Sequence, residues 1–310
     1  MKRLTQNQLE MFQRDGVLIV EDFFDDNDLA PVHRTIERWI DQRAHQRYRK
    51  GTIRELHVDA PFEQRTAQLW AQDPAVIAGM DICQSRLPAL YDFHFCPKLL
   101  DAVEDLIGPE ISINPIAHVR AKMPDALSED RGVELVPWHQ DAAVTWEEAD
   151  ASEIITCWIP LVDATEANGC MRVLPGVHRR GYLTHEKSAA GTAIRNDVFP
   201  HDVKPLVAAC RRGGIVFMTR YTPHQGLVNH TDQVRWSLDL RYHPTGQPSG
   251  RPFYPSFVAR SITDPAQARR DHPAWCRAWE EALLKTRGIG WHRTIPVEDR
   301  VPEGFSFPRR

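Results

Sequence analysis

The chain has 310 residues, of which 42% are hydrophobic and 26% charged, and its formal net charge at pH 7 is -4. This composition is typical of a globular protein with a sizeable core, and it excludes a strongly basic nucleic-acid-binding protein. No apolar run is long enough to span a bilayer, and Met1 begins no signal-peptide pattern. The six cysteines contain no C-x-x-C pair, which favours reduced thiols in a cytoplasmic protein. Because of the charge and the apolar runs, no nucleic-acid or membrane partner is expected.

Helical patterns dominate residues 1–110. Thr5 is placed to cap a short helix that Gly16 closes, and an apolar strand follows over residues 17–20. A longer helix is expected to begin near Asp26 or Asp28 and to run through Ile36, Trp39 and Ile40. A further helical region is expected from about Asp73 to Ile107, where Gly108-Pro109 ends it. We therefore predict a helix-rich region that supports the rest of the domain.

Strand patterns dominate residues 111–245. Within them, segment 181–205 breaks the β pattern and is long for a connection, so it is either a lid or a solvated insertion. If it is a lid, Arg195 is a candidate for substrate contact. Residues 246–310 form a C-terminal extension, in which a helix over residues 274–285 has apolar residues spaced for core packing or a dimer contact.

The run 234–242 alternates strictly between apolar and polar residues, so Arg235 and Ser237 share one face of a predicted strand. On an ordinary strand that face lies in water. In a barrel with a functional interior, the apolar face packs under outer helices and the polar face lines a ligand site. The same parity recurs in other predicted strands, at His118, Arg120 and Lys122 and at Thr156 and Trp158. Several polar faces in one domain favour the second interpretation.

His139 and Asp141 are separated by one residue in a predicted strand. Because residues i and i+2 of a strand point to the same face, both can reach one ion while Gln140 points away. His224 follows a buried run, 215–218, and a short loop. Two imidazoles and one carboxylate are the ligand set of oxygen-activating iron(II) sites. Short motifs also arise by chance, and other histidines are expected at the surface or in loops: His178, His185, His201, His230 and His243.

Three segments accompany these residues: DGVLIVEDFF at 15–24, PWHQD at 137–141 and NGCMRVLPGVH at 168–178. His224 precedes Arg235 by eleven positions. In this order, over about residues 5–245, these features resemble the phytanoyl-CoA dioxygenase family of iron(II)/2-oxoglutarate-dependent oxygenases. One departure is Val177, where the family usually has serine before the histidine.

The resemblance implies a mainly β fold with flanking helices (α+β). Its core is expected to be a double-stranded β-helix of the jelly-roll, cupin-like kind, with N-terminal helices packed outside. It implies a single catalytic domain over residues 1–310, composed of the support region 1–110, the core 111–245 and the extension 246–310.

The resemblance also assigns roles to residues of this chain. His139, Asp141 and His224 are expected to bind iron(II), and Arg235 is expected to bind the distal carboxylate of 2-oxoglutarate through its planar guanidinium. Further cosubstrate contacts are expected from Ser237, Trp158, Thr156 and His118. The alternative for Trp158 is a core aromatic. Substrate contacts are expected from Arg120, Lys122, Trp138 and Arg195.

Asp141 bears on the reaction. Related halogenating enzymes have a small residue in place of this carboxylate, so its presence implies hydroxylation or a related oxidation of an unactivated C–H bond. With 2-oxoglutarate and O2 as cosubstrates, the products include succinate and CO2, and the substrate is expected to be a natural product or another small metabolite. The alternatives are a cupin-like metalloenzyme that does not use 2-oxoglutarate and a non-catalytic jelly-roll binding module. The chain is expected to be a monomer or homodimer.

Overall fold

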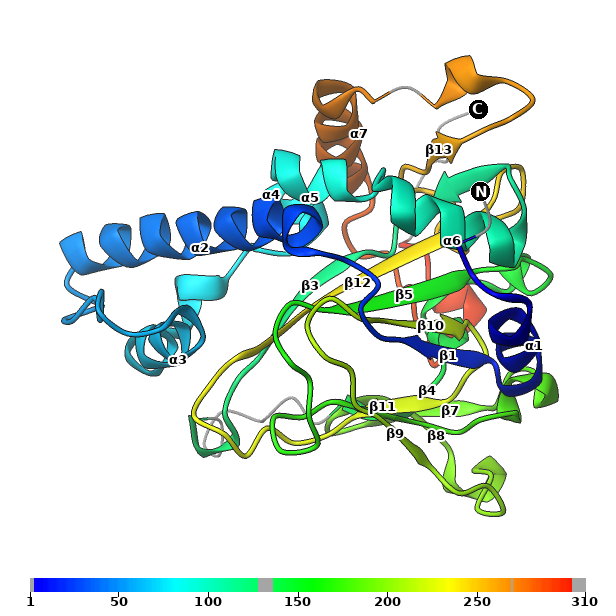
Figure 1. Cartoon of the computed structure of the whole chain (residues 1–310), viewed down its shortest axis with the longest axis horizontal. Coiled ribbons are helices and arrows are strands. Elements are labelled where there is room, and N and C mark those ends of the chain that lie inside the picture. The colour runs from blue at the N-terminus through cyan, green and yellow to red at the C-terminus, as the bar shows by residue number, and fades with distance from the viewer. Residues whose placement is uncertain (1–2, 128–135, 269, 303–310) are drawn as a thin grey trace.

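Two antiparallel sheets face each other, and most helices lie beyond the larger sheet (Figure 1). The computed structural model describes residues 3–127, 136–268 and 270–302. The larger sheet has the order β1-β10-β5-β12-β2-β13, with β3 also paired to β12. Its strands are β1 (Val17–Val20), β2 (Ile111–Ile113), β3 (His118–Lys122), β5 (Ile155–Pro160), β10 (Ile215–Thr219), β12 (Arg235–Pro244) and β13 (Phe257–Arg260).

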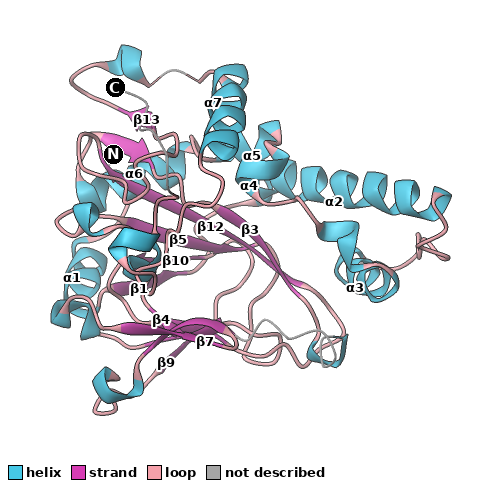
Figure 2. Ribbon diagram, turned by 180° about the vertical axis from the view of Figure 1, so that it is seen from behind, coloured by secondary structure: helices cyan, strands magenta, loops and turns pink. Residues whose placement is uncertain are grey.

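The smaller sheet has the order β4-β11-β6-β9 and lies opposite the larger one, as the view from behind also shows (Figure 2). Its strands are β4 (Val136–His139), β6 (Met171–Val173), β9 (Leu206–Ala208) and β11 (His224–Gly226). Strands β7 (His185–Ser188) and β8 (Gly191–Ile194) form a separate hairpin. The segment 181–205, which interrupts the predicted strand pattern, therefore contains a hairpin of its own.

The first helix begins and ends where the sequence indicates. Helix α1 (Gln6–Asp15) has Thr5 in a capping box with Gln8, and Gly16 closes it with a φ of 70°. At that angle a side chain would be strained, so glycine suits the position. The other α-helices are α2 (Asp26–Arg49), α3 (Phe62–Gln72), α4 (Ile82–Ser85), α5 (Pro88–Phe93), α6 (Pro97–Ile107) and α7 (His272–Lys285).

The helical region expected over residues 73–107 is interrupted. A 3-10 turn and helices α4, α5 and α6 replace one longer element, because Arg86 has a positive φ of 47° and Pro88 and Pro97 each begin a new helix. Helix α3 was not predicted. None of the described helices is long and apolar enough to cross a membrane.

The two faces of the larger sheet differ as strand parity predicts. Leu18, Phe217, Cys157 and Leu240 are register partners in one row across β1, β10, β5 and β12. They belong to the main hydrophobic core, together with residues of α2 and α6 such as Ile36. The apolar face therefore packs under the helices, and the polar face is directed toward the smaller sheet.

A second apolar cluster lies between the two sheets. It joins Trp158 and Met218 of the larger sheet to Met171 and Val173 of the smaller one. Burial of this area stabilises the contact between the sheets at roughly 25 cal/mol for each Å² removed from water. The polar side chains that share this inner face are thus held between two fixed layers.

Candidate metal centre

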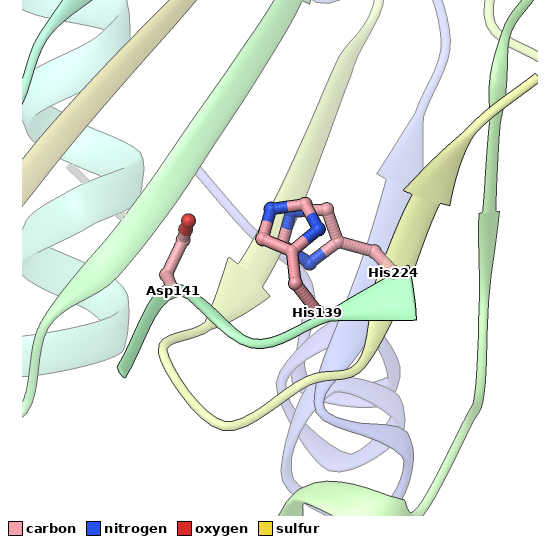
Figure 3. A group of neighbouring side chains, drawn as sticks. All are labelled: His139, Asp141 and His224. Atoms are coloured by element: carbon pink, nitrogen blue, oxygen red, sulfur yellow. The ribbon is translucent and has the colours of Figure 1, made fainter. Parts of the chain in front are cut away.

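Three of the predicted residues come together at one end of the space between the sheets. His139 ends β4 and His224 begins β11, where the two are register partners. One donor atom from each, with a carboxylate oxygen of Asp141, lies within 4.8 Å of the others. Figure 3 shows the two imidazoles side by side with the carboxylate next to them.

The strand that was expected to carry both His139 and Asp141 is shorter than predicted. β4 ends at His139, and Asp141 begins a 3-10 turn over Asp141–Val144. Gln140 between them still has extended dihedral angles, with φ -114° and ψ 142°. The side-chain alternation therefore continues one residue past the strand, and both ligands point the same way as predicted.

Both imidazoles are oriented by backbone carbonyls. Nδ1 of His139 lies 2.9 Å from the carbonyl oxygen of Pro137, and Nδ1 of His224 lies 3.0 Å from that of Thr222. A carbonyl only accepts, so each Nδ1 carries the hydrogen and each Nε2 keeps a lone pair for a metal. Burial lowers the pKa of His139 to about 3, which keeps this ring neutral.

Asp141 is held by two residues of the larger sheet. Arg241 donates from Nη2 to Oδ1 at 2.6 Å and from Nε to Oδ2 at 3.1 Å, and Thr156 donates its hydroxyl to Oδ2 at 2.5 Å. Burial alone would raise the pKa of this carboxyl, but the Arg241 guanidinium holds it well below its usual range. The carboxylate is therefore ionised and fixed in orientation.

Two of these contacts differ from the sequence-based prediction. Thr156 was predicted as a cosubstrate contact, and the structure places its hydroxyl on Asp141. Arg241 was not singled out, although its place on the polar face of β12, six residues after Arg235, was the available signal. Arg241 and Thr156 are register partners on β12 and β5, and this pairing explains why they reach the same carboxylate.

Gln140 points away from the ligands, as predicted, and joins three segments. Its backbone N–H donates to Nε2 of His185 at 3.0 Å, and its side-chain amide donates to the carbonyls of Gly181 and Tyr221 at 2.9 and 2.7 Å. His185 is buried, and burial lowers its pKa to about 4. His185 and His243, which is also buried, are therefore exceptions to the expectation that most of the other histidines lie at the surface or in loops.

The segments that carry the family resemblance meet around the loop before His224. Thr222 donates its hydroxyl to the Gly16 carbonyl at 2.5 Å, and the backbone N–H of Leu174 donates to the Pro223 carbonyl at 3.0 Å. A Cβ added at Gly16 would lie 2.3 Å from Nδ1 of His178. Glycine is therefore needed there both for its φ and for this close approach.

Arg235 lies on the inner face of β12 and is buried. Its Nη1 donates to the Ser237 hydroxyl at 2.7 Å, and its guanidinium carbon lies 5.2 Å from the centre of the Trp158 ring. Trp158 therefore packs in the core between the sheets and also contacts Arg235, so the two interpretations of this tryptophan are compatible. Thr156, which contacts Asp141, is two residues away on the same face, or roughly 7 Å along the strand.

The remaining predicted residues have other partners. His118 pairs with Asp81, the N-cap of α4, at 2.9 Å, and Arg120 pairs with Asp239 at 3.2 Å. Burial lowers the pKa of His118. Lys122 is buried and is the register partner of Arg235.

Two predicted substrate contacts come from the smaller-sheet side. The ring of Trp138 contacts Phe199 with centroids 5.7 Å apart. Arg195 pairs with Asp197 at 2.8 Å, and both side chains are exposed. Nothing in these contacts directs Arg195 toward the metal ligands, so its role remains a prediction.

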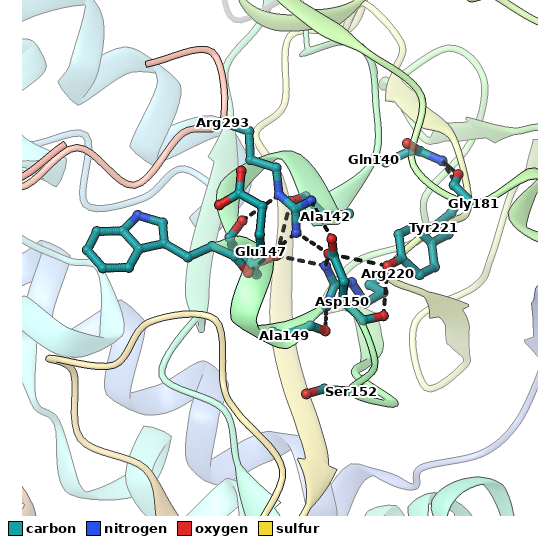
Figure 4. Close-up of polar contacts among 12 residues, drawn as sticks. Gln140, Ala142, Glu147, Ala149, Asp150, Ser152, Gly181, Arg220, Tyr221 and Arg293 are labelled. Atoms are coloured by element: carbon teal, nitrogen blue, oxygen red, sulfur yellow. Dashed lines mark hydrogen bonds and ion pairs between the residues drawn. The ribbon is translucent and has the colours of Figure 1, made fainter. Parts of the chain in front are cut away.

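The loop after Asp141 is bound by a C-terminal strap, residues 288–300, that sequence reasoning did not connect to the site (Figure 4). Arg293 donates to the Thr145 carbonyl at 2.7 Å and to both carboxylate oxygens of Asp150. Buried Arg220 reaches the same carboxylate at 2.9 Å. The side chain of Arg293 also lies over the Tyr182 ring at 4.7 Å, so the strap joins the ligand loop to segment 181–205.

Two imidazoles and one carboxylate between two antiparallel sheets form the facial ligand set of non-haem iron(II) oxygenases. The family model for phytanoyl-CoA dioxygenase (PhyH) matches residues 12–237. The chain therefore belongs to the phytanoyl-CoA dioxygenase family, as the sequence motifs indicated.

Curated relatives and a solved structure agree with this assignment. The ectoine dioxygenase of Bordetella parapertussis is 26% identical over 57% of this chain, and the chain spans only about half (50%) of that relative's length. Phytanoyl-CoA dioxygenase domain-containing protein 1 of Mus musculus is also 26% identical, over 75% of this chain and 87% of its own. The epimerase SnoN, solved in complex with Fe3+, alpha ketoglutarate and nogalamycin RO, superposes with a TM-score of 0.54 at 18% identity, covering 79% of this chain and 86% of its own.

Proposed function

We propose that this protein is an iron(II)/2-oxoglutarate-dependent dioxygenase. It hydroxylates, or otherwise oxidises, an unactivated C–H bond of a small molecule and releases succinate and CO2. The observation that carries the proposal is the juxtaposition of a buried His-Asp-His set with Arg235 on the same inner sheet face. The two facing antiparallel sheets support a jelly-roll core, and the SnoN complex holds iron and alpha ketoglutarate on a similar fold.

The donor atoms fit iron(II). His139 and His224 each bond a carbonyl through Nδ1 and leave Nε2 to face a metal, and Asp141 supplies an ionised oxygen, all inside a largely buried site. Bound iron(II) with 2-oxoglutarate supplies the activation of O2. The chain's own task is to hold these donors, and Arg241 and Thr156 do so for the carboxylate through three hydrogen bonds.

The chain also orients the cosubstrate. Arg235, placed by Ser237 and Trp158, binds the distal carboxylate of 2-oxoglutarate through its planar guanidinium. Because Arg235 is buried, this ion pair forms with little competition from water. Asp141 occupies the position that halogenating relatives leave to a small residue, so the reaction is an oxygenation.

The test is the binding of 2-oxoglutarate to iron-loaded Arg235→Met, followed without O2 through the visible absorption of the iron–2-oxoglutarate chelate. Removing one partner of a buried charge pair costs about 2–5 kcal/mol, so the affinity should fall by roughly 30-fold or more. Arg235→Lys should recover part of it. Arg172→Met is the matched control, because Arg172 is exposed and pairs with Glu166.

Two alternatives give different results. A cupin-like metalloenzyme that does not use 2-oxoglutarate would bind iron, form no chelate band and be insensitive to Arg235→Met. A binding module without a metal would take up no iron after anaerobic reconstitution. Equal chelate formation by the wild type and Arg235→Met would contradict the proposed role of Arg235.

A further inference from the structure

A partly buried cation, which has no acidic partner among the described residues, lies beside the ligand loop. Arg251 donates from Nε to the carbonyl of Val144, the last residue of the turn that Asp141 begins, at 2.8 Å. Within the described residues, no carboxylate pairs with Arg251, and its Nη1 and Nη2 atoms donate to no protein acceptor. Charges withdrawn from water are normally paired, so a partly buried guanidinium without a carboxylate partner is a candidate site for an anion from outside the chain.

The surroundings of Arg251 raise the free-energy cost of keeping its guanidinium charged. Burial lowers the pKa of Arg251 to about 10, and the positive charge of Arg241, which holds Asp141, lowers it further. Two other arginines, Arg120 and Arg293, have acidic partners, since Arg120 pairs with Asp239 and Arg293 with Asp150. Among the described residues, Arg251 has no such acidic partner.

The segment that carries Arg251 is fixed against the ligand loop. The backbone N–H of Trp146 donates to the Gly250 carbonyl at 3.0 Å, and the Ser152 hydroxyl donates to the Pro248 carbonyl at 2.8 Å. Gly250 has a φ of 77°, and a Cβ there would lie 2.4 Å from Cβ of Thr145. The guanidinium is therefore held in place before any ligand arrives, which lowers the entropic cost of binding.

Aromatic rings cover one side of the guanidinium. Its central carbon lies 4.8 Å from the Trp291 ring centre and 5.8 Å from that of Tyr254, and these two rings are neighbours at 4.7 Å. Stacking on aromatic rings fixes the plane of an arginine and leaves its edge for two parallel hydrogen bonds to an oxyanion. Trp291 belongs to the C-terminal strap, outside the residues that the family model matches.

We propose that Arg251 binds the oxyanion of an anionic substrate, a carboxylate or a phosphate, beside the turn that Asp141 begins. The inference rests on the proposed oxygenase function and adds a substrate class to it. Tyr254 and Trp291 would pack against the part of the substrate that adjoins its charged group. Two of the cations predicted from the sequence as substrate contacts, Arg120 and Arg195, are already paired with aspartates of the chain, and Arg251 is not.

The test uses protein loaded with iron(II) and 2-oxoglutarate in the absence of O2, so that the cosubstrate site is filled. Phenylacetate, phenyl phosphate and the neutral phenylacetamide are titrated against tryptophan fluorescence and the melting temperature. The wild type should bind at least one of the two anions and bind the amide at least about tenfold more weakly. Arg251→Met should weaken anion binding at least about tenfold, and Arg251→Lys should weaken it less.

The matched control is Arg277→Met, an exposed arginine on α7. It should bind the anions as the wild type does. Equal anion binding by Arg251→Met, equal binding of the amide, or no anion binding by the wild type would each overturn the proposal. Circular dichroism shows whether Arg251→Met is folded, and Arg251→Lys gives a second variant if it is not.

The two proposals fail separately. Absence of the chelate absorption in the wild type would count against the oxygenase function. The same anion titrations on the metal-free protein would then still decide whether Arg251 binds an oxyanion.

Discussion

The ligand residues are oriented before a metal binds. His139 and His224 each have one nitrogen bonded to a carbonyl, and Asp141 is paired with Arg241. Such outer contacts fix ligand orientation and tautomer in metal sites. In the metal-free protein, Arg241 compensates the buried negative charge of Asp141. When iron binds, the metal and Arg241 share this task.

We predict that Arg241→Met destabilises the metal-free protein more than the iron-loaded protein. Removing one partner of a buried ion pair costs about 3–5 kcal/mol, but bound iron(II) supplies a positive charge to the same carboxylate. The rise in melting temperature on adding iron should therefore be larger in Arg241→Met than in the wild type. Thermal unfolding with and without iron(II), under anaerobic conditions, measures it.

Arg120→Met is the control for this experiment. Arg120 also pairs with an aspartate on the inner face of the larger sheet, but its side chain is 55% exposed, so its loss should cost less than about 1 kcal/mol. An iron-induced rise that is the same in Arg241→Met and the wild type would show that Arg241 does not compensate Asp141 in the metal-free state.

At the scale of elements, the C-terminal strap is bound to the turn that begins with Asp141. The backbone N–H of Arg293 donates to the Ala143 carbonyl at 2.9 Å, and the Trp146 indole donates to the Gly290 carbonyl at 3.1 Å. In the strap, Nδ1 of His292 lies 2.7 Å from the hydroxyl oxygen of Thr192, which belongs to β8. One segment thus touches both the ligand loop and the β7–β8 hairpin.

We predict that Arg293→Met loosens residues 142–150 and the hairpin together. The side chain contributes several charge-assisted hydrogen bonds in a buried position, each of which is worth about 1.5–3 kcal/mol. Hydrogen exchange should become faster at backbone amides of both segments and stay unchanged in β1 and β10. Arg277→Met should change neither. Faster exchange confined to the strap would contradict this coupling.

Strand parity predicted the inner and outer faces of the larger sheet because each face is read from neighbouring residues. The strict alternation over 234–242 is enough to assign Arg235 and Trp236 to opposite faces, and Trp236 is indeed in the main core. Helix α3 was missed, and the region over 73–107 was expected as one stretch. These elements depend on local breaks such as the positive φ of Arg86, which a periodic pattern does not show.

At the scale of the whole molecule, the site is assembled from segments far apart in the chain. The residues around His224 include Gly16 and Leu174, and those around Asp141 include Arg241 and Arg293. Sequence motifs located the three ligands because their spacing and order are local features. They could not locate Arg251 or Arg293, because each contacts the loop after Asp141 only when a distant segment of the chain packs against that loop.

The family match and the fold agree with the sequence-based prediction of a helix-covered, antiparallel β protein. The regions assigned to support and extension also contribute strands to the larger sheet, β1 from the first and β13 from the second. Their sequences gave no sign of this for β13, because an edge strand of four residues has little pattern of its own.

The central claim is that His139, Asp141 and His224 bind one iron(II) that then binds 2-oxoglutarate. Its most direct test is an anaerobic titration of iron(II) followed by 2-oxoglutarate, read as bound iron per chain and as chelate absorption. The wild type and His201→Ala, a control at an exposed histidine, should bind one iron and form the chelate. His224→Ala should do neither, and iron binding that survives His224→Ala unchanged would contradict the account.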